Sequence, residues 1–463
     1  TLAAPLDVVC QQLIGMACAG EHSAGSAFEL IRQAGPMAEL SRADFDACLA
    51  FLAGELAAPA GAFEPEPGAT PRWTAPRIWS RAGRFGIRGR RVACWFRNNV
   101  GTIGSEESVR VLEQGVAVGT LEASYAERLA PGDRFVLDGR ALEVRRLEAA
   151  IVHARPAGGE PSLPRWTSDR QSLSPELAGE LAAFRAVAAH RLAEVGPTGL
   201  RAWLIATFDL EPGAASVVVE LFQAQEQWSE VPGGEGLLVE ESPAPHGAER
   251  VYCFHAPLHR AACEALARAT GARLGRRFGR SLTLAVADLG WSIRLPEEIA
   301  LAPEEIAPLL AVDHFDDDVV EGLDRGELLA RRFRQVAATA MMILRNPEPG
   351  RRVRVGGVHW ASTRLYPLVR AACPDHPLLR QTRREVLEEY LDVPAARRWL
   401  QRRPPVRFRA LPGLSPMAAA WIEPNPAEAL QFESPGAALR RLHARLLGNS
   451  SLAGQLVTNL PPG

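Results

Sequence analysis

The apolar positions near the start of the chain recur every three or four residues. They are Leu6, Val9, Leu13 and Met16. This period is that of an amphipathic helix and predicts one over residues 6–17. Residues 26–33 repeat the pattern, and a third helix is predicted from Ser41, because Ser41 and Asp44 form the S-x-x-D signature that satisfies amide groups at a helix start. Three short helices predict a winged-helix domain over residues 1–62.

The third of these helices is acidic. It carries Asp44, Asp46 and Glu55 against only Arg42, and carboxylates do not suit a helix that docks beside phosphates. We therefore expect the domain to position a neighbour rather than to read DNA itself.

The pattern changes after residues 57–70, which are rich in proline and glycine and resemble a linker. Short runs of strand-forming residues follow, separated by turn-forming pairs such as Asn98-Asn99 and Asp138-Gly139. The runs are residues 92–96, 108–112, 115–121, 134–137 and 142–147. Closely spaced short strands predict a small β-barrel over residues 63–160, with an approach rich in arginine and aromatic residues.

The rest of the chain predicts one further domain with two parts. Over residues 161–300 helices and strands alternate, which predicts an α/β unit; its first helix starts at Ser174-Pro175. We expect strands at residues 215–221, 249–254, 283–288 and 291–295, and a helix at residues 257–270. Residues 301–447 follow helical spacing and predict the helical part of the same domain, and residues 448–463 are predicted to be a flexible tail. The fold class is therefore α+β and multidomain, with a winged helix, a small β-barrel, an α/β unit and a C-terminal helical region.

Composition excludes several functions. All 52 basic residues are arginine, since the chain contains no lysine, and both a P-loop and Schiff-base chemistry require one. We therefore do not expect this chain to hydrolyse ATP alone, and whether it is an enzyme stays open. With a net charge of -2, any nucleic-acid binding has to come from local arginine clusters.

The same composition bears on location. No apolar stretch approaches the roughly 20 residues of a membrane-spanning helix, so no membrane partner is predicted. Seven scattered cysteines without a C-x-x-C motif suit free thiols in a reducing cytoplasm. The chain begins at Thr1 and not at Met, which we interpret as the downstream part of a longer reading frame.

Residues 72–97 give the densest chemical signal, because arginines and aromatic residues alternate there without any Asp or Glu. The arginines are Arg72, Arg77, Arg81, Arg84, Arg88, Arg90, Arg91 and Arg97, and the aromatic residues are Trp73, Trp79, Phe85, Trp95 and Phe96. Guanidinium groups bind phosphates and aromatic faces stack on bases, so the mixture is typical of single-strand binding. The alternative is a solvated arginine face around core aromatics.

Three more arginine clusters either extend one electropositive track or are scattered surface charge. They are Arg273, Arg276, Arg277 and Arg280; Arg351, Arg352 and Arg354; and the arginines within residues 397–409. Only their placement in the fold separates the two interpretations.

A second candidate site consists of Cys253, His255, His259 and Cys263, whose spacing allows a zinc ion to be held by a strand and the following helix. The opposing interpretation is that Cys253 and His255 lie in a buried strand and that Cys263 is a core thiol, and this is the one we favour. No H-E-x-x-H, G-x-S-x-G or Rossmann glycine motif is present. We therefore predict no catalytic residue and no cofactor in this chain.

An ordered series of motifs resembles the Lhr-type (large helicase-related) superfamily-2 DNA helicases, and among them the ligase-associated DEXH-box branch. The series begins with Pro5-Leu6-Asp7-Val8-Val9, Phe96-Arg97-Asn98-Asn99-Val100-Gly101-Thr102-Ile103, Gly119-Thr120-Leu121-Glu122 and Leu129-Ala130-Pro131-Gly132-Asp133-Arg134-Phe135. It continues with Pro164-Arg165-Trp166, Phe254-His255-Ala256-Pro257-Leu258, Ala287-Asp288-Leu289-Gly290-Trp291, Phe333-Arg334-Gln335-Val336-Ala337 and His376-Pro377-Leu378-Leu379-Arg380-Gln381. The resemblance covers residues 5 to about 425, and the family's Asn-Asp-Tyr-Gly-Phe-like turn departs from its usual form at residues 287–291.

The resemblance implies the strand-gripping and duplex-separating part of a 3′-to-5′ ATP-dependent helicase acting in DNA repair. ATP and Mg²⁺ would be bound by RecA-like motor domains upstream of Thr1, and the partners would be single-stranded DNA and a DNA duplex or RNA:DNA hybrid. It also implies that Trp166 stacks on a base and that Ile103 wedges into the nucleotide path. The expected strand contacts are Arg97, Asn98, Asn99 and Thr102, with Arg91 and Arg165 added as neighbouring cations. The alternatives are a stand-alone nucleic-acid-binding protein and a metal-dependent enzyme built on the cysteine and histidine cluster.

Overall fold

The computed structural model describes most of the chain. The described residues are 3–56, 73–101, 108–122, 129, 131–137, 140–148, 151–157, 172–244, 249–344, 365–422 and 428–433. The chain divides into two compact units, and neither is continuous in sequence. The first contains residues 1–170 and 328–390, and the second contains residues 171–327 and 391–463. Among the described helices, none is both long and apolar enough to cross a membrane.

The first unit opens with the predicted winged helix, built from three helices and a three-stranded sheet of order β1-β3-β2. The elements are α1 (Leu6–Ala19), β1 (His22–Ser23), α2 (Ala24–Arg32), the short 3-10 helix η1 (Gly35–Met37), α3 (Arg42–Ala53), β2 (Ile78–Arg81) and β3 (Arg84–Ile87). The serine cap that the sequence predicts for α3 is confirmed, because the Ser41 hydroxyl accepts from the Asp44 amide at 3.0 Å. Leu13, Phe45 and Leu52 are fully buried in its core.

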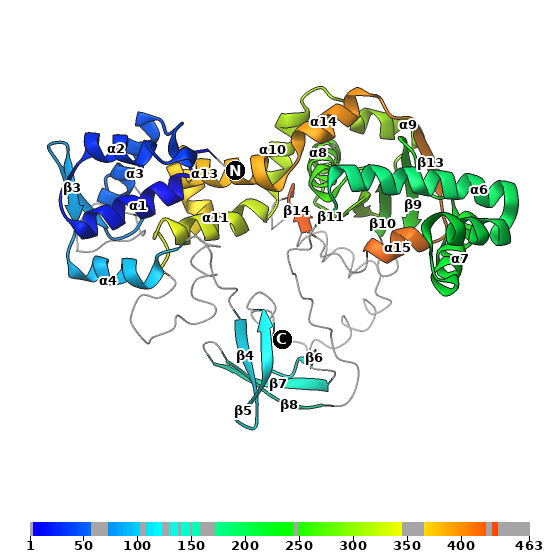
Figure 1. Ribbon diagram of the computed structural model, residues 1–463, viewed down its shortest axis with the longest axis horizontal. Coiled ribbons are helices and arrows are strands. Elements are labelled where there is room, and N and C mark those ends of the chain that lie inside the picture. Colours follow the sequence, from blue (N-terminus) through cyan, green and yellow to red (C-terminus); the bar gives the residue numbers. More distant parts are fainter. Residues whose placement is uncertain are drawn as a thin grey trace, which may run out of the picture. The chain divides into compact units, whose positions relative to one another are not determined.

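Two helices from far along the chain complete this module. Helices α11 (Leu328–Thr339) and α13 (Pro377–Glu385), followed by the π-helical turn η3 (Val386–Tyr390), pack beside α1 (Figure 1). The Gln381 side chain accepts from the Leu6 amide at 2.9 Å, which ties α13 to the first residue of α1. The sequence predicts residues 161–447 as one domain, whereas α11 and α13 lie in the first unit, because these helices are packed against the N-terminal helices.

Residues 92–96, predicted as a strand, lie in helix α4 (Arg90–Asn99). The tertiary contact decides this: the Phe96 ring lies so close to Gly15 of α1 that a Cβ there would be 2.9 Å from it. Strand β3 likewise pairs with β1 of the winged helix, and β2 pairs with β3. The predicted domain boundary at residues 62/63 therefore falls inside this module, and the arginine-rich stretch belongs to the wing and α4 instead of to the barrel.

The predicted barrel is a five-stranded sheet of order β5-β4-β8-β7-β6, open between β5 and β6 among the described residues. Its strands are β4 (Ser108–Glu113), β5 (Val116–Glu122), β6 (Arg134–Leu137), β7 (Arg140–Glu148) and β8 (Ile151–Pro156). Four of them match predicted strands, and β8 was missed. Alternate side chains such as Val111, Phe135, Val144 and Val152 form its core.

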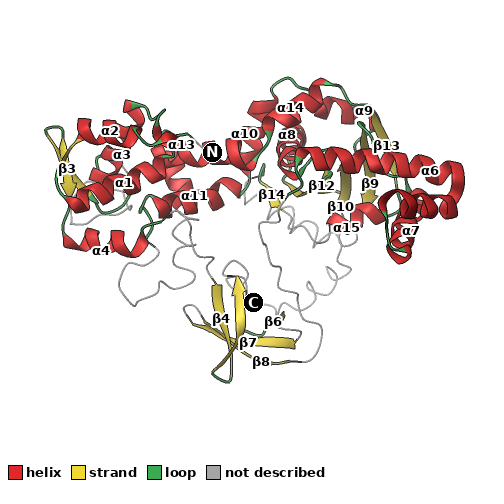
Figure 2. Cartoon of the chain, viewed as in Figure 1, coloured by secondary structure: helices red, strands yellow, loops and turns green. Residues whose placement is uncertain are grey.

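The second unit is built on a six-stranded sheet of order β13-β9-β10-β12-β11-β14 (Figure 2). Its strands are β9 (Leu237–Pro243), β10 (Glu249–His255), β11 (Leu282–Ala287), β12 (Gly290–Pro296), β13 (Val406–Ala410) and β14 (Glu428–Leu430). The strands predicted at residues 283–288 and 291–295 are confirmed as β11 and β12, which pair as an antiparallel hairpin. Strands β13 and β14, by contrast, come from the region that the sequence predicts as helical.

Helices surround this sheet. They are α6 (Pro175–Phe208), α7 (Pro212–Trp228), α8 (Arg260–Phe278), α9 (Pro303–Ile306), η2 (Ala307–Leu310), α10 (Phe315–Arg325), α14 (Val393–Gln401) and α15 (Pro416–Ile422). The cap of α6 is as predicted, since the Ser174 hydroxyl accepts from the Leu177 amide at 3.2 Å. Residues 215–221, predicted as a strand, lie in α7, where Ala215, Val219 and Phe222 are buried at helical spacing.

Candidate nucleic-acid interface

The wing of the winged helix is the tight hairpin formed by β2 and β3, and its tip is positively charged. Ala82 and Gly83 both have positive φ, 49° and 71°, which is the geometry of a two-residue type I′ turn. The turn places Arg81 directly opposite Arg84 on the ladder. Like charges in this position repel each other, and both side chains are exposed, although Arg84 lies 3.7 Å from Glu21. An anion bound at the tip would relieve this repulsion.

The N-terminus of α4 carries a second concentration of positive charge. Gly89 is the capping residue and supplies no side-chain cap, and the first turn contains Arg90 and Arg91 but no acid. The N-terminus of a helix is already its positive end, so cations there are unfavourable and an anion is favoured. Arg88, Arg90 and Arg91 are all exposed. The exposed arginines and the helix end therefore concentrate positive charge beside the hairpin.

One arginine of the stretch is structural. Arg77 is buried, and its guanidinium group donates to the Met341 carbonyl at 2.8 and 3.2 Å and to the Thr74 hydroxyl at 2.9 Å. Burial lowers the pKa of Arg77 to about 10, so it stays charged at neutral pH. Its guanidinium carbon lies 4.7 Å from the centre of the Trp95 ring, and that of Arg91 lies 5.0 Å from it. Arg77 therefore holds Trp95 and the start of the wing in place.

The aromatic residues of the stretch have mixed roles. Trp73 and Phe85 are buried core residues, as the alternative interpretation of this stretch holds. Trp79 lies flat over Gly86, whose Cβ would be 2.8 Å from the indole. Trp95 is only half-buried. The described aromatics thus support the wing and α4 more than they offer free stacking surfaces.

The Gln11 side chain holds the backbone at Gly101, just after the end of α4. Its side-chain oxygen accepts from the Gly101 amide at 3.1 Å, and its side-chain nitrogen donates to the carbonyls of Gly101 at 3.4 Å and Thr339 at 3.0 Å. Gln11 is buried, with 3% of its surface exposed. Gly101 directly precedes Thr102 and Ile103, so Gln11 anchors the base of that segment. The sequence gives no sign of this role.

The residues predicted to contact the strand fall into three groups. Arg91 and Arg97 are exposed, and Asn98 is half-buried. Asn99 is 7% exposed and donates to the Trp95 carbonyl at 2.8 Å, so its amide stabilises α4 and does not face solvent as a strand contact requires. Thr102, Ile103, Arg165 and Trp166 lie outside the described residues.

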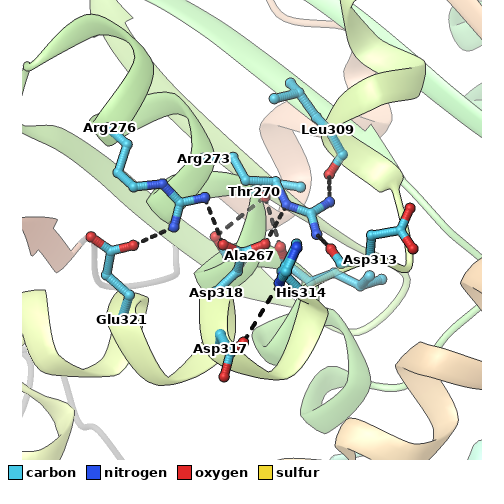
Figure 3. A network of polar contacts seen from close by, with 11 residues as sticks. Ala267, Thr270, Arg273, Arg276, Leu309, Asp313, His314, Asp317, Asp318 and Glu321 are labelled. Carbon is cyan, nitrogen blue, oxygen red and sulfur yellow. Dashed lines mark hydrogen bonds and ion pairs between the residues drawn. The ribbon is translucent and has the colours of Figure 1, made fainter.

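The cluster at Arg273, Arg276, Arg277 and Arg280 is paired with acidic residues within the fold, as Figure 3 shows for Arg273 and Arg276. Arg273 and Arg276 share Asp318 at 2.6 and 2.7 Å. Arg276 also pairs with Glu321, Arg277 pairs with Glu305, and Arg280 pairs with Glu433. These guanidinium groups therefore join α8 to its neighbours and do not extend an electropositive track.

The other two clusters are paired only in part. Arg351, Arg352 and Arg354 lie outside the described residues. In the last cluster, Arg397 pairs with Asp316, and Arg407 and Arg409 both pair with Glu230, at 2.6 and 3.2 Å, whereas Arg398, Arg402 and Arg403 are exposed without an acidic partner among the described residues. The wing and α4 carry the larger group of such arginines, because Arg81, Arg88, Arg90, Arg91 and Arg97 have no acidic partner within the described part of the chain.

The structure does not bring the proposed zinc ligands together. His255 faces Glu240 at 3.0 Å, His259 faces Asp392 at 3.2 Å, and Cys263 donates to the Leu258 carbonyl at 3.4 Å. Cys253 packs in an apolar cluster. Burial raises the pKa of both thiols, which opposes the thiolate form that binds metals. Within the described residues, no group of three or more His, Cys, Asp and Glu side chains is placed to hold a metal ion.

Comparison with known proteins shows which family models and relatives this chain matches. The family model described as "Large helicase-related protein, winged helix domain" matches residues 1–163, and the model described as "DEAD/H associated" matches residues 231–418. ATP-dependent helicase Lhr-Core protein 2 of Thermococcus barophilus is 32% identical over 86% of this chain and 44% of its own length. ATP-dependent helicase Lhr-Core of Methanocaldococcus jannaschii is 29% identical over 97% of this chain and 51% of its own length.

A solved structure shows the same fold. The Mycobacterium smegmatis helicase Lhr, bound to ssDNA and AMP-PNP, matches with a TM-score of 0.65 at 23% identity, over 91% of this chain and 48% of that protein. The chain thus spans about half the length of the proteins it matches.

Proposed function

This chain belongs to the Lhr (large helicase-related) family and corresponds to its C-terminal portion, and from this we propose that it grips single-stranded DNA for a helicase motor. One observation carries the proposal: five exposed arginines on the wing and α4 have no acidic partner among the described residues, while the arginines of α8 are paired. The finer placement in the ligase-associated DEXH-box branch stays a prediction.

The geometry suggests how the grip works. Guanidinium groups make two parallel hydrogen bonds to a phosphate and so fix its orientation. Arg88, Arg90 and Arg91 surround the N-terminus of α4, whose free amides favour an anion. Gln11 holds the base of the segment that leads to Ile103, which we propose as the wedge in the nucleotide path. Trp166 is proposed as the base-stacking platform on the strength of the resemblance.

Energy has to come from elsewhere. A chain without lysine cannot form a P-loop, so it does not fit ATP and Mg²⁺ as its own ligands. We propose that RecA-like motor domains bind both, and that this portion converts their closure into 3′-to-5′ movement along DNA. A role in DNA repair, with a DNA duplex or RNA:DNA hybrid as the structure to be separated, completes the proposal.

A binding titration tests the central step. Fluorescein-labelled oligo(dT), the matching duplex and an RNA:DNA hybrid are titrated with the purified chain at several NaCl concentrations, and anisotropy is recorded. Five phosphate contacts predict a slope of about -3.5 in log K against log salt, since each contributes about -0.7 on single strands. A flat response, or equal affinity for a neutral peptide-nucleic-acid strand, contradicts the proposal.

A further inference from the structure

A small cavity lies in the second unit where helix α6 meets the start of β9 and the end of β10. Its volume is about 10 Å³, which is room for a single water-sized group. Its walls come from α6, from the loop before β9, from the turn after β10 and from the β11–β12 turn. The lining residues used below are Arg185, Gly233, Gly234, Gly236 and His255.

The loop before β9 lines this cavity with glycine residues, which present backbone atoms and no side chain. Its sequence is Pro232-Gly233-Gly234-Glu235-Gly236. A Cβ on Gly233 would lie 2.6 Å from the backbone nitrogen of Ala186, so only glycine lets the loop lie directly on α6. The Gly234 amide donates to the Ala182 carbonyl at 3.0 Å, and Gly234 has a φ of 73°. The loop is therefore fixed against the helix, and Arg185 is on the same helix.

Arg185 has no partner for its charge. It makes no hydrogen bond, ion pair or ring contact with any part of the chain that the structure describes. Burial lowers the pKa of Arg185, and no acid offsets this effect; a guanidinium group nevertheless stays protonated at neutral pH. By comparison, Arg268 in the same unit pairs with both Glu264 and Glu428. Arg185 is half-buried in the cavity wall, and a partly desolvated charge without a counter-charge favours an anion beside it.

The cavity-lining residue His255 faces a buried carboxylate whose oxygens are already hydrogen-bonded. Glu240 accepts from Gln225 at 3.0 Å, from the Ser415 hydroxyl at 2.6 Å, and pairs with His255 at 3.0 Å. Since Glu240 lies directly against His255, the pair adds no net positive charge. The Arg185 charge therefore remains for a ligand from outside.

We propose that Arg185 and the glycine loop form an anion site that takes one oxygen of a phosphate group. The size of the cavity limits the ligand to a single oxygen atom, while the rest of the phosphate stays at the mouth. The phosphate has two conceivable sources, a nucleic-acid backbone and free phosphate. We assign it to the backbone of the bound strand, and this assignment alone rests on the proposed function.

Two measurements on the full chain test the site. In the first, unfolding temperature is measured in sodium phosphate and in NaCl at equal ionic strength. We expect phosphate to raise it by about 2 °C more in the wild type than in Arg185→Gln, in which only the other arginines and the general stabilising effect of phosphate remain, and we expect Arg185→Lys to retain part of this difference. Because Arg185→Gln removes an uncompensated charge, its unfolding temperature in NaCl should equal or exceed that of the wild type.

In the second, oligo(dT) affinity is measured by anisotropy for Arg185→Gln and for the control Arg201→Gln. Arg201 is also on α6, but it is exposed and donates to the Ser216 hydroxyl at 2.9 Å. We expect Arg185→Gln to weaken binding about 3- to 10-fold and to reduce the salt slope by about 0.7, with Arg201→Gln within twofold of the wild type.

The outcomes distinguish the anion site at Arg185 from the proposed binding of single-stranded DNA. A phosphate effect without any change in DNA affinity supports the anion site and overturns the strand as its source. If the wild type binds no DNA, the proposed function fails while the phosphate measurement still decides this site. Equal phosphate responses in the wild type and Arg185→Gln overturn the site.

Discussion

The charge at the N-terminus of α4 gives the sharpest test of the interface. We consider the triple variant Arg88→Gln, Arg90→Gln and Arg91→Gln. Five arginines of residues 73–101 are exposed without a described acidic partner, so the wild type should lose affinity about 100-fold when salt rises from about 50 to about 200 mM. In the triple variant only Arg81 and Arg97 remain, so its affinity should fall only about sevenfold over the same rise in salt. At low salt the variant should therefore bind oligo(dT) far more weakly than the wild type.

The same variant should fold at least as well as the wild type. Each cation removed from the positive end of α4 relieves an unfavourable interaction of about 0.3–1 kcal/mol, so the unfolding temperature should stay equal or rise. Binding and stability thus move in opposite directions, which a misfolded variant cannot reproduce. Arg42→Gln is the matched control, since Arg42 pairs with Asp46 at 2.9 Å on α3; its salt slope should equal the wild-type slope. An unchanged slope in the triple variant would refute the assignment of these arginines.

Three further predictions address single residues. Trp166→Ala should weaken oligo(dT) binding about 10- to 100-fold while the unfolding temperature stays unchanged, because stacking contributes about 1–3 kcal/mol per base; an unchanged Kd removes Trp166 from the site. Gln11→Leu leaves the Gly101 amide unsatisfied and should lower the free energy of unfolding in urea by about 1–3 kcal/mol, and equal urea midpoints would contradict this. Burial, and then Glu385, raise the pKa of Asp7 from 3.8 to about 6, so stability from this group is present below about pH 4 and is lost as pH rises to about 6. Asp7→Asn should therefore exceed wild-type stability at pH 7.5 by on the order of 2–3 kcal/mol and match it at pH 4, and a constant difference would exclude Asp7 as the cause.

Local signals in the sequence predict much of the fold. The serine caps at Ser41 and Ser174 are local hydrogen bonds, so the sequence alone locates both helix starts. The strands of the five-stranded sheet follow from alternation and turn pairs in the same way. Residues 92–96 and 215–221 show where this fails: both are rich in strand-forming residues, but Phe96 packs on Gly15 and Val219 packs inside the α6–α7 core. Tertiary packing overrides local propensity at both places.

The candidate site is harder to predict because charge pairing depends on distant residues. Arg276 and Arg90 both occur in arginine-rich runs, yet Arg276 meets Asp318 and Glu321, more than 40 positions away, and Arg90 meets no described acid. The role of Gln11 is equally distant, since its partners are Gly101 and Thr339. No local pattern encodes these pairings, so only the fold can separate arginines that hold the protein together from arginines available to a ligand.

This separation also reconciles the proposed binding of a polyanion with the negative net charge of the chain. Asp318 and Glu230 each pair with two arginines inside the second unit, so these carboxylates stabilise the fold there. Residues 73–101 contain seven arginines and no Asp or Glu, so their charge is not cancelled locally and attracts phosphates even though the net charge of the chain is -2. Binding strength should therefore follow the charge of this segment and not the isoelectric point of the whole chain, and replacing acids elsewhere on the surface should leave the salt slope unchanged.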